Sequence, residues 1–150
     1  MTDALSLLGQ VEGNFVVRAE AYLRTGAVEE AHWLAQRGLE NARHRKTRGT
    51  EARALWLLGE IAMRRDPPAV APAEAHYQQA LTMADELGMR PLQAHCHLGL
   101  GTLYAMTGQR EQARVALSAA IALYRAMDMT FWLPQTEAAL AQMGGVEEIR

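Results

Sequence analysis

The chain has 150 residues, of which 49% are hydrophobic and 21% charged, and its 15 Lys and Arg against 17 Asp and Glu leave a net charge of −2. This balance excludes a disordered protein and a surface that attracts nucleic acid or anionic lipid as a whole. The single cysteine, Cys96, excludes an internal disulfide framework and a cysteine-based zinc site. We expect no signal peptide, because the start has no basic region and no long apolar core, and no apolar run approaches the roughly 18 residues of a membrane span. We therefore expect a cytoplasmic protein with no membrane partner.

The composition also predicts the fold class. The chain contains 27 alanines but only ten Val and Ile together. Alanine is the best helix former, whereas β-branched residues favour strands, so we predict an all-α protein. Because small side chains let helices approach closely, many of these alanines are expected at helix crossings.

Helix breakers and apolar periodicity divide the chain into helices. In chain order we expect one helix that ends near Gly26 and six more over residues 28–44, 50–65, 72–87, 91–106, 109–127 and 130–143. Pro67 and Pro68 forbid helix between the third and fourth. Gly88 and Gly108 end two of the others, and Gly144-Gly145 stops the last. Residues 1–13 stay ambiguous, since two glycines weaken a helix there.

The helical units repeat along the chain. Connections of two or three residues, as around Gly108, require antiparallel neighbouring helices. A shift of about 40 residues superimposes Tyr77 and Ala80 on Leu117 and Ala120, and a shift of about 42 superimposes Ala31 on Ala73. The sequence therefore predicts a stack of helical hairpins with a period near 40–42 residues.

One spacing within this repeat, G-x2-Y-x3-G-x4-A-x3-L-x2-A, resembles the tetratricopeptide repeat (TPR). Its best copy consists of Gly101, Tyr104, Gly108, Ala113, Leu117 and Ala120. A second copy contains Gly59, Ala73, Tyr77 and Ala80, and a weaker first copy contains Tyr22, Gly26 and Ala31. We expect the glycines and alanines at helix crossings, with Tyr22 and Tyr104 filling the gaps beside them.

The resemblance implies a single domain over residues 1–150, folded as a right-handed α-α superhelix. Its three hairpins would cover about 12–45, 50–88 and 91–127, with a capping helix at about 130–143. The period exceeds that of a standard repeat and resembles the C-terminal TPR tails of bacterial multidomain ATPase and nucleotide-cyclase regulators. HEAT-type repeats share the longer period but do not require this spacing.

The resemblance also implies a concave groove that binds a protein or peptide segment. By register, its lining residues would be Val16, Glu20, Arg24, Arg53, Trp56, Glu60, Met63, Arg64, His95, Thr102 and Met106. Positions three and four apart share a helix face, and Trp and Arg dominate interaction hot spots. Trp56 beside Arg53 is therefore the expected peptide anchor. The alternative is that Trp56 packs against a neighbouring helix.

Two further functions stay open. In the first, the N-terminal face with Phe15, Val16 and Leu23 packs on a second copy of the chain as a homodimer. In the second, the basic cluster Arg43–Arg48 contacts the phosphates of a nucleic acid. A helix end whose cations complement the helix dipole explains the same cluster without any ligand, so nucleic acid is not an expected partner.

We expect no enzyme, no metal and no cofactor. His95, Cys96 and His97 are adjacent, and neighbouring helix positions diverge by about 100°, so the three side chains cannot easily share one ion. The sequence contains no paired acid and base, no nucleophile motif and no partner base for Cys96.

Overall fold

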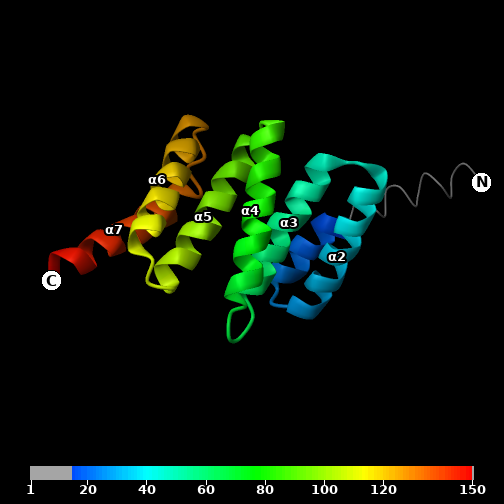
Figure 1. The fold of residues 1–150 in the computed structure, drawn as a ribbon, viewed down its shortest axis with the longest axis horizontal. Helices are drawn as coiled ribbons and strands as arrows, with labels where there is room; N and C mark the ends of the chain where they lie inside the picture. Colours follow the sequence, from blue (N-terminus) through cyan, green and yellow to red (C-terminus); the bar gives the residue numbers. More distant parts are fainter. Residues whose placement is uncertain (1–14, 150) are drawn as a thin grey trace, which may run out of the picture. The chain divides into compact units, whose positions relative to one another are not determined.

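The computed structural model describes residues 15–149, with side chains described to residue 143. Residues 1–13, which the sequence left ambiguous, lie outside this part. A helix over residues 15–24 is followed by α2 (Val28–Arg45), α3 (Arg48–Met63), α4 (Val70–Leu87), α5 (Arg90–Met106), α6 (Arg110–Ala126) and α7 (Leu133–Ile149) (Figure 1). Every regular element of the described residues is a helix, so the prediction of an all-α fold is confirmed.

The chain forms two compact units, Met1–Met83 and Ala84–Arg150, whose boundary falls within α4. In the first unit α2 packs against α3; in the second α5 packs against α6, and α6 against α7. Consecutive helices therefore pair as predicted. The repeat appears in the helix starts: α3 begins at Arg48 and α5 at Arg90, 42 residues later, while α4 and α6 begin 40 residues apart.

One turn recurs at helix ends in the described part of the chain. After the helix of residues 15–24 and after α2, α4, α5 and α6, a backbone N–H donates to the carbonyl five residues earlier, over 2.8–2.9 Å. The preceding residue is left-handed in each turn: Gly26, Lys46, Gly88, Gly108 and Asp128. This bond pattern satisfies carbonyls that the helix end would leave unpaired.

The connection from α3 to α4 is different. As expected, Pro67 and Pro68 lie outside the helices, but α3 ends at Met63 rather than near residue 65. The N–H of Ala69 donates to the carbonyl of Ala62 over 2.9 Å, and α4 begins at Val70. The helix therefore starts ahead of Pro72, because a proline in the first turn lacks only an N–H that has no helical partner there.

Glycines lie where paired helices come closest. A Cβ on Gly59 would lie 2.8 Å from the ring of Tyr77 in α4, and one on Gly101 would lie 2.7 Å from the side chain of Leu117 in α6. The repeat alanines are fully buried: Ala31, Ala73, Ala80, Ala113 and Ala120. Tyr104 is also buried.

Two expectations for the first unit were wrong. Tyr22 is 39% exposed, so it does not fill a gap between helices. Val16, expected in the groove, is buried and lies 3.0 Å from where a Cβ on Gly38 would be. In this pair the glycine at the crossing, Gly38, therefore lies on the second helix and faces a valine of the first helix. In the pairs α3–α4 and α5–α6 the glycine lies on the first helix.

The last helix also departs from its prediction. It begins at Leu133 instead of residue 130, and it continues through Gly144 and Gly145 to Ile149. Residues 130–132 form a turn, and Thr136 bonds back to the carbonyl of Trp132 through both its N–H and its hydroxyl. Each glycine weakens a helix by only about 1 kcal/mol relative to alanine, and this cost does not by itself end the helix.

Candidate binding surface

Five of the predicted groove residues of the first unit lie on α3 or directly after it, and we call Arg53, Trp56, Glu60, Met63 and Arg64 the α3 stripe. Arg53 donates to Glu20 of the first helix from Nε over 2.7 Å and from a terminal nitrogen over 2.6 Å. Its guanidinium also lies 5.7 Å from the centre of the Trp56 ring. Three of the predicted residues therefore form one connected group.

The other end of the stripe is tied to two helices. The Tyr77 hydroxyl of α4 donates to the carboxylate of Glu60. Arg64 donates to the backbone carbonyl of Leu23 over 3.2 Å, close to the end of the first helix. Burial raises the pKa of Glu60, while the Tyr77 hydrogen bond and the Arg64 charge oppose that rise. Each charged group of the stripe thus has a defined neighbour.

The exposed part of this surface is limited. Arg24 and Arg53 are exposed, while Trp56 and Met63 are half-buried. On the other side of α3, Leu55, Leu58 and Ile61 are buried. The stripe can therefore offer a partner a partly covered aromatic ring between a held guanidinium and a carboxylate. A cation above an exposed ring contributes about 0.5–1 kcal/mol.

The predicted groove residues of the second unit have different surroundings. His95 Nδ1 lies 2.7 Å from the Tyr124 hydroxyl oxygen, and its ring meets the Trp132 ring edge-on at 4.9 Å. His95 therefore belongs to an internal aromatic cluster. Thr102 is exposed and bonds to the carbonyl of Leu98, and Met106 is 51% exposed.

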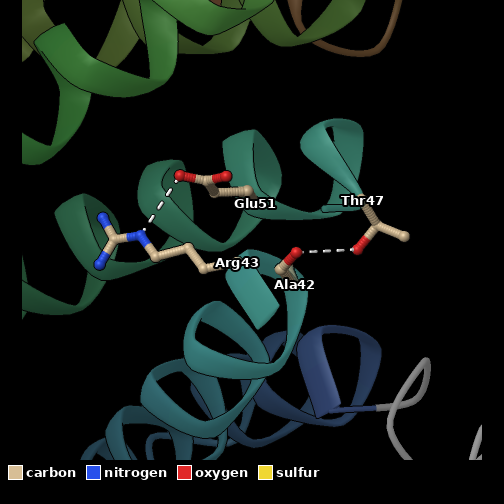
Figure 2. A network of polar contacts seen from close by, with 4 residues as sticks. All are labelled: Ala42, Arg43, Thr47 and Glu51. Atoms are coloured by element: carbon tan, nitrogen blue, oxygen red, sulfur yellow. Dashed lines mark hydrogen bonds and ion pairs between the residues drawn. The ribbon is translucent and has the colours of Figure 1, made fainter. Parts of the chain in front are cut away.

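The basic cluster 43–48 forms the corner between α2 and α3 (Figure 2). Arg43 Nε lies 3.3 Å from a carboxylate oxygen of Glu51, and the Thr47 hydroxyl donates to the Ala42 carbonyl over 3.4 Å. Arg43, His44 and Arg45 occupy the last turn of α2, where cations complement the helix dipole. The position of these cations agrees with the explanation that they complement the dipole at the end of α2.

The N-terminal apolar face is not open as expected. Val16 and Leu23 are 3% and 5% exposed, and Phe15 is half-buried beside Gly38. The homodimer hypothesis therefore loses the residues on which it depended, because they are already covered within the first unit.

The described residues contain no group of three or more His, Cys, Asp and Glu side chains arranged to hold a metal ion. Cys96 is fully buried. Burial lowers the pKa of His97, and the negative charge of Asp85 opposes that shift. None of the helices described is both long and apolar enough to cross a bilayer.

A cavity of about 130 Å³ lies in the first unit and is lined by His32, Arg65 and His76 among other residues, and no sequence pattern indicated it. These three residues lie on α2, on the α3–α4 connection and on α4. No local spacing could have joined them, since they come together only when the helices pack.

Comparison with known proteins adds no assignment: no protein-family model matches the chain, and no curated protein matches it.

Proposed function

We propose that this protein is a non-catalytic, TPR-like interaction module that binds an extended segment of a partner protein along the α3 stripe. Support comes from helical hairpins repeating every 40–42 residues, with a glycine at the crossing of α3 with α4 and of α5 with α6. Such pairs stack in repeat proteins and leave elongated surfaces for partners. The resemblance to C-terminal TPR tails supports a role as the regulatory tail of a larger signalling protein, and the composition with its single cysteine supports a cytoplasmic location.

The observation that carries this proposal is the connected group of Glu20, Arg53 and Trp56. Glu20 holds the Arg53 guanidinium, which in turn lies over the half-buried Trp56 ring. A side chain held before binding loses less conformational entropy when a partner arrives. Arginine and tryptophan are also the residues most enriched among interaction hot spots. We therefore expect the partner segment to place an apolar side chain against Trp56 and a polar group near Arg53.

The test starts from a random peptide library selected on the whole protein. Peptides that bind are then measured by fluorescence polarisation against the wild type, Trp56→Ala and Arg53→Glu. We expect each substitution to weaken binding at least tenfold, which corresponds to about 1.4 kcal/mol.

The chain provides a matched control. Trp33 on α2 is 56% exposed, and Arg37 lies 4.8 Å from the centre of its ring, so Trp33→Ala removes an equivalent cation–aromatic pair elsewhere. Trp33→Ala should bind peptides like the wild type. The proposal is wrong if Trp56→Ala and Arg53→Glu bind as well as the control, or if the library yields no binder.

A further inference from the structure

The cavity of the first unit has an apolar floor. Leu58, Ile61 and Ala62 of α3 form it, and all three are buried. An engineered apolar cavity of about 150 Å³ is known to hold a benzene molecule. A space of about 130 Å³ therefore suits a compact apolar group of roughly six heavy atoms.

The polar side chains that line the same cavity are one arginine and two histidines, and each of them can donate a hydrogen bond from a nitrogen. His32, Arg65 and His76 line it together with apolar residues, and no carboxylate of the described residues does so. Arg65 pairs with Glu29, whose side chain is 79% exposed and does not line the cavity. A guanidinium carries five N–H donors, so this ion pair leaves Arg65 able to donate to a second acceptor.

His76 makes this donor set unusual. Its Nδ1 atom is buried and has no hydrogen-bond partner among the residues that the structure describes. A buried polar atom left without a partner costs about 1–3 kcal/mol, so folded proteins rarely keep one without a reason. When Nδ1 carries the ring proton, an acceptor bound in the cavity would supply the missing partner.

From this juxtaposition of apolar floor and nitrogen donors we infer that the cavity binds a small organic carboxylate, with its hydrocarbon body on α3 and its acidic group at His76 and Arg65. Hydrogen bonds to a carboxylate are about twice as strong as those between neutral groups. None of the lining residues belongs to the α3 stripe, so the site is separate from the proposed protein-binding surface.

The charges around His76 agree with an anionic ligand. Burial lowers the pKa of His76, and the positive charges of His32 and Arg43 lower it further. A carboxylate bound between His76 and Arg65 would oppose the effect of those cations. The pKa of His76 is therefore expected to rise in the complex.

The test uses the whole chain titrated with benzoate and 3-methylbutanoate, with benzamide as an uncharged control of the same shape as benzoate. Calorimetry measures affinity, and nitrogen-15 NMR of the histidine side chains follows His76 directly. We expect saturable binding of both acids, at least tenfold weaker binding of benzamide, and a shift of the His76 ring resonances with a raised pKa.

Variants distinguish this site from adsorption elsewhere. His76→Leu and Arg65→Gln should each weaken benzoate binding at least tenfold, while His44→Gln, an exposed histidine at the end of α2, should bind like the wild type. His76→Leu should also fold at least as stably as the wild type, since it removes a buried atom without a partner. Arg65→Gln keeps the test decisive if His76→Leu fails to fold.

Three results would overturn the inference. The first is no saturable binding of either acid below about 10 mM, where the interaction free energy is already under about 3 kcal/mol. The second is equal affinity for benzoate and benzamide. The third is wild-type affinity in folded His76→Leu or Arg65→Gln.

Discussion

The helix pairs α3–α4 and α5–α6 are built on one spacing but connected differently. Gly59 meets Tyr77 at one crossing, and Gly101 meets Leu117 at the other, so the contacts occupy equivalent repeat positions. The α5–α6 connection is a tight turn at left-handed Gly108, whereas the α3–α4 connection contains two prolines and is longer. The short distance between the paired helices restricts the residues that fit at the crossing, whereas the length and sequence of the connection differ between the two pairs.

The longer α3–α4 connection also lines the cavity of the first unit. Arg65 and Ala69 of the longer connection line it, together with Pro72 at the start of α4. At the crossing, the Tyr77 ring extends further than Leu117, and its hydroxyl reaches Glu60. We infer that the glycines at the crossings preserve the packing of each helix pair. The residues that differ between the two pairs supply the additional polar groups, such as the Tyr77 hydroxyl and Arg65. The following predictions test that division.

The largest effect is expected at the crossings. Gly59→Val and Gly101→Val place atoms where even a Cβ would lie 2.8 Å and 2.7 Å from the partner side chain. We expect each to lower the free energy of unfolding by about 3 kcal/mol, the upper end of the cost of overpacking. Chemical denaturation measured by circular dichroism gives this quantity.

Ala105→Val is the control, because Ala105 is an exposed position of the same helix as Gly101. It should cost only the helix propensity of valine, about 0.5 kcal/mol. Equal losses for Gly101→Val and Ala105→Val would contradict the close approach of α5 and α6.

The second largest effect is expected for two tyrosine hydroxyls, each of which contacts a side chain on the first helix of its pair. Tyr77→Phe removes the donor to the carboxylate of Glu60, and Tyr124→Phe removes the contact with His95. We expect losses of about 2 kcal/mol and 1 kcal/mol, since a bond to a charged group contributes more than a bond between neutral groups.

Thermal and urea unfolding of the two variants measure this difference. Phenylalanine keeps the ring in place, so each loss reports the hydroxyl alone. A Tyr77→Phe protein as stable as the wild type would show that Glu60 does not need this donor.

The third effect concerns the turns. Gly108 has a φ of 80° and nothing within 4 Å of where a Cβ would be, so Gly108→Ala should cost about 1 kcal/mol through backbone conformation alone. Lys46 has a φ of 60° at the α2–α3 turn, and Lys46→Gly should gain up to about 1 kcal/mol. Melting temperatures should therefore move in opposite directions.

Lys46→Ala serves as the reference, because alanine keeps the unfavourable conformation while losing the lysine charge. If Lys46→Gly and Lys46→Ala have the same melting temperature, the left-handed turn does not limit stability at this corner.

The smallest effect is a pH dependence from Glu60. Burial raises its pKa in the folded state, so as pH rises the unfolded chain ionises first. The stability of the wild type relative to Glu60→Gln is therefore greatest below the ordinary carboxyl pKa and falls as pH rises through the raised value. Urea unfolding of both proteins between about pH 4 and 7 measures this, and a difference that grows with pH would reverse the assignment.

Several features of the fold could be predicted from local residue chemistry. Helix existence, the prolines of the α3–α4 connection and the ends at Gly88 and Gly108 follow from propensity and backbone restriction. The left-handed conformations of Lys46 and Asp128 could not be predicted in this way, because lysine rarely adopts that conformation and aspartate adopts it only occasionally. Repetition of the turn places them there.

The candidate site was predictable only in part. The spacing of Arg53, Trp56 and Glu60 on one helix face follows from 3.6 residues per turn. The attachment of Arg53 to Glu20 and the enclosure of His95 by Tyr124 and Trp132 required helices distant in sequence to meet. Repeat register placed Val16 and His95 in the predicted groove. In the structure, Val16 instead packs beside Gly38, and His95 contacts Tyr124 and Trp132.

The sequence by itself determined an all-α chain, the 40–42-residue repeat and the glycines at two helix crossings, because helix propensity and side-chain size are properties of single residues and short spacings. Only the tertiary structure decided which polar groups are paired, and that His76 and Arg65 line one cavity with apolar residues of α3, with no partner for His76 Nδ1 among the described residues. Burial and hydrogen-bond pairing depend on the atoms that neighbouring helices supply, and no single helix contains that information.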